Sequence, residues 1–258
     1  MPITAFEPIQ GEGGGGSFAD RRARLSAKGT TDARVLVYGT NSPDNILQPL
    51  WTTGGLLWPY TPIITDNASV QYDSYDPVHT NQPFMAFKSV AAKEIMCSGQ
   101  FTAMNQQEAE YCLAAIHFLR TITKMYFGVG GSDQAAIDAR GTPPPILLFN
   151  AHGTAMFHNV PVIVTSYSIE LPQDVDYVEL STTQARPALL NILDNIDEAF
   201  TNPARVENRR TEKISAWIPT RFNVTVNMTV QNTPNRLRRN FNLNDFRTGA
   251  LIKKGGWI

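Results

Sequence analysis

The sequence is poor in charge, poor in cysteine and free of long apolar runs. Charged residues make up 17% of its 258 residues, against about 25% in an average globular domain. The formal net charge is −1, which is not typical of a free-standing nucleic-acid-binding protein, because such proteins usually carry a basic excess. No apolar run approaches the roughly 20 residues of a membrane-spanning helix, and the N-terminal residues lack the layout of a signal peptide. We therefore expect no membrane partner.

The sequence contains two cysteines, Cys97 and Cys112, without CxxC spacing. This pattern predicts buried free thiols in a reducing compartment rather than a disulfide framework. Thr, Asn, Gln and Ser take the place of the missing charge. A neutral polar surface suits burial against partners or the wall of a pore, and the alternative interpretation is an ordinary β-rich domain.

The residue types that carry chemistry are present but do not form a recognisable site. Histidines without a nearby carboxylate or third ligand make a poor metal site, and aspartates at strand ends are typical of turns. The GxSxG and HExxH patterns are absent. We therefore expect no catalytic residue, no metal, no cofactor and no enzymatic activity. The residues considered are His79, His117 (expected to be an interior or interface histidine), His152, His158, Asp73, Asp76, Asp174 and Asp176.

The clearest predicted helix spans about 105–127. Asn105 can cap its start, Glu108 completes a capping-box-like pattern, and Gly128 is a natural stop. The helix has two apolar stripes, so we expect it to be covered on two sides. The second stripe either meets another part of the same chain or forms an inter-subunit face. The residues proposed for that face are Tyr111, Phe118, Ile122 and Met125. A shorter helix is predicted at about 187–200.

The remaining pattern is mainly β. Strands are predicted at 35–38, 63–75 with a turn near 66–67, 84–90, 95–103, 146–149, 160–171 and 217–231. In the last of these, apolar residues alternate with polar ones, and the polar face has one charge in six positions. A face so neutral suits a water-filled channel, and the alternative is plain solvent exposure.

Both ends of the chain are predicted to be arms. Residues 1–34 contain a glycine run and a basic patch, which indicates a flexible N-terminal arm. Residues 235–258 mix basic and apolar side chains, which indicates an arm that docks on a partner. Its proposed contact residues are Arg236, Arg238, Arg239, Phe241, Phe246 and Trp257. Region 170–202 has seven acids and one base, so the basic arm could meet this acidic region on a neighbouring subunit.

Six segments, taken together and in order, resemble the baseplate tail-tube cap and tail-tube initiator proteins of contractile-tailed bacteriophages. The resemblance covers about 70% of the chain and is absent from residues 1–34. The segments are LLWPYTP (56–62), HTNQPF (79–84), EAEYCLAAIHFLRTITKMYFG (108–128), GTPPPILLF (141–149), MFHNVPVIVTSYSIELPQDVDYV (156–178) and FNLNDFRTGALIKKGGWI (241–258).

The resemblance implies an antiparallel β-sandwich or barrel of the tail-tube type over 35–234, with one long flanking helix and extended terminal arms. Six copies would form a ring in the baseplate of the virion, assembled in the host cytoplasm, between the hub protein and the tail tube protein. A sheath initiator and the tape-measure protein are further implied partners, and DNA would pass only as non-specific cargo. The residues predicted to face the lumen are Asn223, Thr225, Asn227 and Thr229.

Two alternative functions remain open at this point. The chain could be the repeated tail tube protein itself, which the same resemblance allows. It could instead be a monomeric β-sandwich that binds carbohydrate or peptide through an aromatic cluster of Trp51, Trp58 and Tyr60.

Overall fold

The computed structural model describes residues 22–29, 31–39, 41–42, 45–126, 141–185 and 211–258. Its centre is a seven-stranded sheet with the strand order β2-β1-β7-β8-β11-β6-β3, and every pairing in it is antiparallel. The prediction of a mainly β protein with an antiparallel sheet is therefore confirmed. The strands are β1 (Arg24–Ala27), β2 (Leu56–Leu57), β3 (Ile63–Asn67), β6 (Glu94–Thr102), β7 (Leu147–Ala151), β8 (Phe157–Glu170) and β11 (Arg221–Val230).

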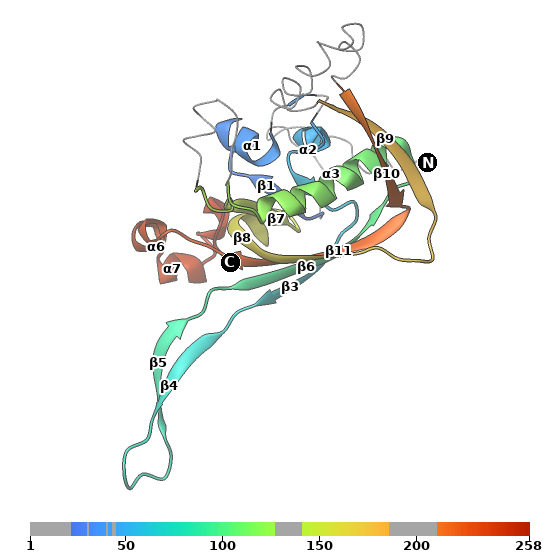
Figure 1. Cartoon of the computed structure of the whole chain (residues 1–258). Coiled ribbons are helices and arrows are strands. Elements are labelled where there is room, and N and C mark those ends of the chain that lie inside the picture. Colours follow the sequence, from blue (N-terminus) through green and yellow to red (C-terminus); the bar gives the residue numbers. More distant parts are fainter. Residues whose placement is uncertain (1–21, 30, 40, 43–44, 127–140, 186–210) are drawn as a thin grey trace, which may run out of the picture.

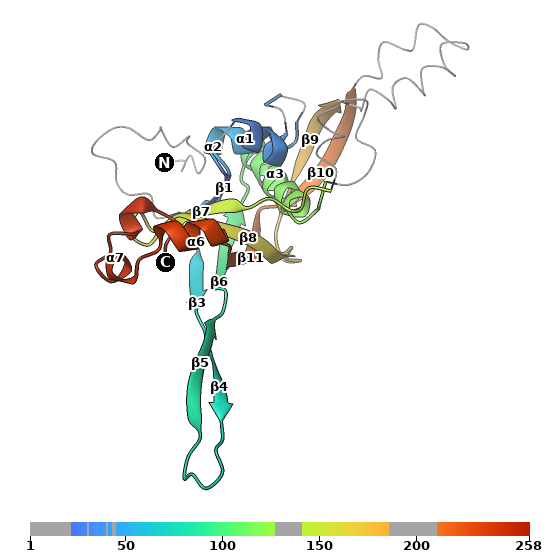
Figure 2. The same ribbon diagram turned by 90° about the vertical axis from the view of Figure 1, so that its left-hand side faces the viewer.

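Helices and a second ribbon cover one face of this sheet (Figure 1). The helices are α1 (Thr31–Tyr38), α2 (Gln48–Thr53) and α3 (Gln106–Ile122), and the ribbon consists of β9 (Tyr177–Ala185) and β10 (Thr211–Pro219). Over the described part of the chain, no helix or strand covers the other face of β3, β6 and β11 (Figures 1 and 2). The sheet is therefore dry on one side and open on the other.

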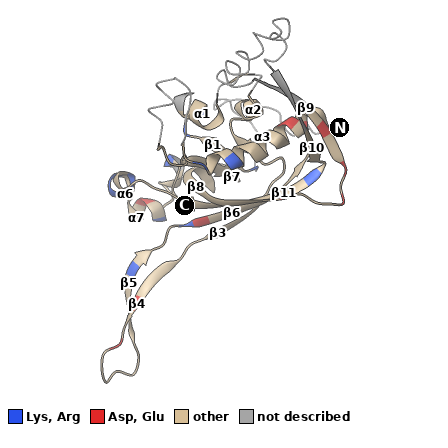
Figure 3. Cartoon of the chain, viewed as in Figure 1, with Lys and Arg blue, Asp and Glu red and all other residues tan. Residues whose placement is uncertain are grey.

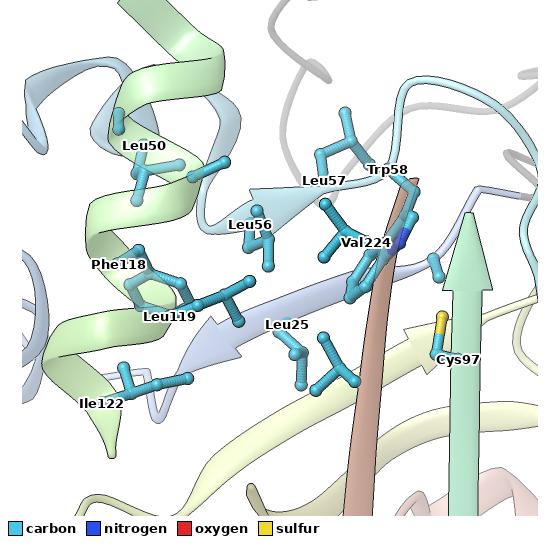
Figure 4. Packing of buried hydrophobic residues seen from close by; sticks show 14 of the residues in the cluster. Leu25, Leu50, Leu56, Leu57, Trp58, Cys97, Phe118, Leu119, Ile122 and Val224 are labelled. Atoms are coloured by element: carbon cyan, nitrogen blue, oxygen red, sulfur yellow. The ribbon is translucent and has the colours of Figure 1, made fainter. Parts of the chain in front are cut away.

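The core lies between α3 and the sheet (Figure 4). Leu25 of β1, Leu56 of β2, Phe118 of α3 and Val224 of β11 are each no more than 1% exposed. Burying a side chain of this size contributes about 1.5–3 kcal/mol, so the contact between helix and sheet provides much of the stability. Aromatic rings continue this core toward β6, where Phe101 stacks on Phe222 with ring centroids 5.5 Å apart.

Strict alternation along β11 explains why the sheet has one dry face. Phe222, Val224, Val226 and Met228 are buried, whereas the residues between them are exposed or half-buried. The predicted strand at 160–171 corresponds to β8, which pairs with β11. The predicted strand 217–231 is in fact two strands, because the chain turns at Thr220 between β10 and β11.

The start of α3 follows the prediction. The Asn105 side chain accepts a hydrogen bond from Glu108 N–H at 2.9 Å, and the Glu108 carboxylate accepts one from Met104 N–H at 2.8 Å, which satisfies amide groups that a helix start leaves unpaired. The end of the helix comes earlier than predicted, at Ile122. Beyond it, Tyr126 exchanges backbone hydrogen bonds with residues 141 and 142, which draws the chain away from the helix axis.

The predicted arm and the predicted strand near the N-terminus are wrong for residues 24–38. Residues 24–27 form β1 within the sheet, and residues 31–38 form α1. The cause is a long-range contact: Ala27 N–H donates to the Tyr38 hydroxyl at 2.7 Å, and the Leu25 and Tyr38 side chains are fully buried. Residues 1–21 of the predicted arm and the predicted helix at 187–200 lie outside the described residues.

The C-terminal segment is folded rather than extended, so that part of the fold prediction is wrong. It forms α6 (Pro234–Asn240), α7 (Leu243–Arg247) and the short 3-10 helix η2 (Ile252–Lys254). The segment returns to its own sheet, because Gly256 N–H donates to His158 C=O at 2.6 Å and the Leu251 and Trp257 side chains are buried.

A β-hairpin projects from the body of the molecule (Figures 1 and 2). It consists of β4 (Val70–Tyr75) and β5 (Phe84–Val90), which lie between β3 and β6 in the sequence. Nearly all of its residues are exposed. An isolated two-stranded hairpin is marginally stable in water at best, so this element is the part of the fold with the greatest need of a partner.

Candidate functional site

The open face of the sheet carries the residues that were predicted to line a lumen. Asn223, Thr225, Asn227 and Thr229 share this face of β11 and are exposed or half-buried. Hydrogen bonds join them to the neighbouring strands: the Ser98 and Thr225 hydroxyls lie 2.8 Å apart, and the Asn227 amide donates to Ser166 Oγ at 2.9 Å. The side chains thus form a fixed, uncharged polar surface. Whether it faces a lumen stays a prediction.

The charged members of this face lie toward the strand ends. Glu94 begins β6, Arg221 begins β11 and Glu170 ends β8. Between these ends the face is neutral across the ladder that joins β6, β11 and β8. Hydroxyl and amide groups carry no net charge, so such a surface lacks the electrostatic attraction by which cationic side chains hold a nucleic acid.

Two strand edges at the borders of this face lack a partner within the described chain. β3 pairs with β6 alone. β8 pairs with β7 only as far as Val162, and from Ile163 to Glu170 it has β11 on one side and no described strand on the other. Unpaired strand edges present rows of N–H and C=O groups that can pair with another chain. These two edges are therefore candidate junctions between subunits.

One face of the projecting hairpin gathers five exposed apolar side chains. Tyr72 lies opposite Phe87 in the register, and their rings meet edge to face at a centroid distance of 6.0 Å. The same face includes Val70, Met85 and Val90, and all five side chains are at least 48% exposed. A contiguous apolar surface of this kind marks an interaction site in a soluble protein. Sequence reasoning did not single it out, although alternation of Val70 and Tyr72 was a weak signal.

The inter-subunit face predicted on the long helix is wrong for three of its four residues. Tyr111, Phe118 and Ile122 are buried within their own chain, where the Tyr111 hydroxyl accepts from Leu57 N–H at 2.7 Å. The second apolar stripe is thus covered by α1, α2 and β2, which is the alternative that the sequence left open. Met125 lies beyond the helix end and is 49% exposed.

Two of the proposed docking residues at the C-terminus, Arg236 and Trp257, are engaged with their own chain. The Arg236 guanidinium donates to Gly255 C=O at 2.7 Å and lies 5.0 Å from the centre of the Trp257 ring. Phe241 packs against both Phe246 and Trp257 but stays partly exposed. Arg238 and Arg239 are exposed, so of the predicted arm these two cations and the two phenylalanines keep surface for a partner.

The aromatic cluster predicted for the alternative binding module does not form a binding surface. Trp58 is fully buried and packs against Phe101, so it cannot touch a ligand. Trp51 is only partly exposed and its ring meets Tyr38. Tyr60 is exposed, but its hydroxyl lies 3.2 Å from that of Thr102. Of the three side chains, only that of Tyr60 is classed as exposed.

The two thiols are buried and unpaired, as predicted. Burial raises the pKa of the Cys97 and Cys112 thiols well above the ordinary range, which disfavours the reactive thiolate. His117 is exposed on α3 rather than interior, and partial desolvation, with a smaller effect of Arg120, lowers its pKa.

The remaining candidates for chemistry are scattered. His79 and His152 occupy left-handed turn positions with φ of 64° and 54°, and Asp73 pairs with Lys88 at 3.1 Å. Within the described residues, no group of three or more His, Cys, Asp or Glu side chains could hold a metal ion. A search of that same part of the chain finds no helix with the length and apolar character needed to cross a membrane.

The described part of the chain therefore presents three exposed features: a neutral polar face, two strand edges without a described partner and an apolar hairpin face. Comparison with known proteins does not identify a family with this arrangement. No protein-family model matches the chain, and no curated protein sequence matches it significantly.

Proposed function

We propose that this chain is a structural subunit of the baseplate of a contractile bacteriophage tail, where six copies form a ring that joins the hub to the tail tube and initiates tube assembly. The observation that carries the proposal is the open face of β6, β11 and β8, which is polar, uncharged in its middle and bordered by unpaired strand edges. The sequence resemblance to tail-tube cap and initiator proteins supports the same conclusion.

Ring closure follows from the two edges. When β3 of one copy meets residues 163–170 of β8 in the next, the contact joins different surfaces and repeats by rotation, which is the contact type that produces closed rings. The sheet then continues from copy to copy, and each junction removes an edge that would otherwise invite aggregation. The neutral faces of Thr225 and Asn227 lie on the inside of the resulting barrel.

The hairpin gives each copy a second contact beyond its sheet. Its apolar face of Val70, Tyr72, Met85, Phe87 and Val90 needs a covering surface. A neighbouring ring subunit or the adjoining hub or tube ring supplies that surface. In this arrangement DNA passes as non-specific cargo, and the sheath initiator and the tape-measure protein contact the outer surface and the lumen, respectively.

Electron microscopy of native tail particles tests the proposal, with antibody or density assigned to this chain. We expect a single six-fold ring between hub and tube, with β11 toward the lumen. Repeated rings along the whole tail would identify the tail tube protein instead. Absence of the chain from every particle would contradict the proposal. The buried position of Trp58 already weakens the case for a carbohydrate- or peptide-binding module.

A further inference from the structure

A small apolar groove lies where the C-terminal end of α1 meets the end of α3. Its volume is about 140 Å³, and apolar cavities of about 150 Å³ accept a benzene ring. Two of the lining side chains, Val37 and Ile122, are buried, whereas Leu36, Met125 and Tyr126 are between 39% and 51% exposed. The groove is therefore large enough for one aromatic side chain, and its apolar rim is uncovered in the described part of the chain.

The backbone holds one wall of the groove in place. Tyr126 N–H donates to Thr142 C=O at 2.9 Å, and Gly141 N–H donates to Tyr126 C=O at 2.8 Å. Pro143 and Pro145 belong to the same wall, and a proline ring fixes its own φ. Because the groove is already formed, an occupant need not order it, which lowers the entropic cost of binding.

Charge at the groove favours an acidic occupant. Lys124 lines the groove and is exposed, and no Asp or Glu of the described residues lines it. Along α3, Glu108 lies in the first turn and Arg120 in the last turn, so the acidic end of the helix is the end away from the groove (Figure 3). A suitable occupant combines a large apolar side chain with a carboxylate.

The N-terminal sequence ITAFEPI, residues 3–9, has this combination. Phe6 is directly followed by Glu7, and two isoleucines flank the pair. Pro8 favours an extended backbone at the residue before it, which suits a segment that lies along a groove. The glycine-rich sequence GEGGGGS, residues 11–17, separates this segment from β1.

The groove lies within reach of this segment. Ala27 is about 10 Å along β1 from Arg24, and its N–H donates to the Tyr38 hydroxyl at 2.7 Å. Tyr38 directly follows Val37 of the groove, so the groove lies within about 25 Å of Arg24. The 15 residues from Ile9 to Arg24 span about 20 Å as a random coil and about 50 Å when extended.

We propose that residues 3–9 dock in this groove of their own chain, with the Phe6 ring in the cavity and the Glu7 carboxylate beside Lys124. The linker gives the segment an effective concentration of about a millimolar, so a weak contact is sufficient. Docking covers the exposed rim of the groove, and another molecule reaches this surface only by displacing the segment. The inference does not depend on the proposed function, because the groove lies on the helix-covered side of the sheet, away from the polar face (Figure 1).

Oxidation of Met125 in the full chain measures whether the groove is covered. Docking shields the thioether, so Phe6→Ala should raise the rate of Met125 sulfoxide formation by hydrogen peroxide at least about threefold. Met156, which is 57% exposed and does not line the groove, provides the internal standard in the same mass spectrum. Phe18→Ala is the matched control and should leave the Met125 rate as in wild type.

A cysteine pair identifies the occupant. Thr121 lines the groove, and we expect a chain with Ala5→Cys and Thr121→Cys to form an intramolecular disulfide under mild oxidation in dilute solution. Phe6→Ala in the same chain should slow this reaction at least about tenfold, because the tether alone then brings the thiols together. Ser74→Cys on the hairpin, in place of Thr121→Cys, is the control and should react no faster than the Phe6→Ala chain. The native thiols are buried and do not compete.

Three results would overturn the inference. Equal Met125 oxidation in wild type and Phe6→Ala would show that residue 6 does not cover the groove. A disulfide that forms equally fast with and without Phe6 would reflect the tether alone. Disulfide-linked dimers in place of the intramolecular product would identify a second copy as the occupant. Both assays use the isolated chain, so they neither decide nor depend on whether particle microscopy finds the protein in tails.

Discussion

Gly99 lies directly against the indole ring of Trp58. A Cβ on Gly99 would be 2.5 Å from Trp58 Cδ1 and 3.0 Å from Pro62 Cβ. Trp58 is fully buried there, and its indole N–H has no hydrogen-bond acceptor among the described residues. The close fit of the ring against a bare backbone therefore matters more at this site than polar pairing does.

We expect Gly99→Ala to destabilise the fold by about 1–3 kcal/mol, because the added methyl group forces the indole ring or β6 to move in a packed core. Chemical unfolding followed by tryptophan fluorescence measures the effect. Gly29→Ala is the matched control, since no atom lies within 4 Å of its added methyl group. Equal stability of the Gly99→Ala variant and wild type would contradict the packing described here.

Two buried tyrosines predict how the fold responds to alkali. Burial raises the pKa of Tyr38 from 10.0 to about 12, against a smaller lowering by the hydrogen bond from Ala27, and burial likewise raises the pKa of Tyr111. The folded state thus holds these protons more tightly than the unfolded state does. Below pH 10 the two protonated hydroxyl groups make their full contribution to the free energy of unfolding. This contribution is lost as the pH rises from 10 toward 12, because the unfolded chain then releases these protons more readily than the folded chain does.

Absorbance titration of tyrosinate is the test of this behaviour. Tyr38 and Tyr111 should ionise only together with unfolding. Tyr38→Phe should lessen the alkaline loss of stability, although it also removes the hydrogen bond to Ala27. Ionisation of Tyr38 and Tyr111 in a chain that stays folded would rule out the burial of these two side chains.

The hairpin face should matter for assembly and not for folding. We expect Tyr72→Ser with Phe87→Ser to change the free energy of unfolding of the body by less than about 0.5 kcal/mol, because both side chains are exposed. Incorporation into tail particles should fall by at least about tenfold, as for the loss of aromatic anchors at an interface.

Residues on the other face of the hairpin provide the control. Gln71→Ala with Ser89→Ala removes one exposed hydrogen bond and leaves the apolar face intact, so particles should form normally. If the control and the aromatic variant were incorporated into tail particles equally well, the apolar hairpin face would not be a contact surface in the particle.

Arg236 should hold the C-terminus in place. The Arg236→Ala substitution removes its hydrogen bond to Gly255 C=O and its contact with the Trp257 ring. We expect this to lower the local stability of the C-terminal segment by about 1–2 kcal/mol. Hydrogen exchange measured by mass spectrometry should show faster exchange across 241–258 with little change in the sheet. Arg239→Ala, which removes an exposed cation of the same helix, should leave exchange as in wild type.

Secondary-structure elements were predicted correctly from the sequence where they depend on residues close together in the chain. Asn105 and Glu108 marked the start of α3 because helix caps involve residues three apart. The alternation from Phe222 to Met228 marked the dry face of β11, and it also placed Asn223, Thr225 and their neighbours on the opposite face.

Predictions failed where a distant residue decides the structure. Residues 35–38 have strand-like composition but form a helix, and the Tyr38 hydroxyl is held by Ala27. The partner of the second stripe of α3 could not be read from sequence either, because Leu57 and α1 supply it from far along the chain. Arg34 and Arg24 are a further example, because both side chains come close to Gly54 only after α1 folds onto β1.

The hairpin and the sheet form one continuous mechanical element. Only two residues join β3 to β4, and across this junction Ala91 N–H donates to Ser69 C=O at 3.0 Å, so the hydrogen-bonded ladder is not interrupted by a slack linker. A force applied at the hairpin tip is therefore carried as shear along β6 and into β11 at the centre of the sheet. The projection works as a cantilever, and a displacement of its tip pulls directly on the centre of the seven-stranded sheet.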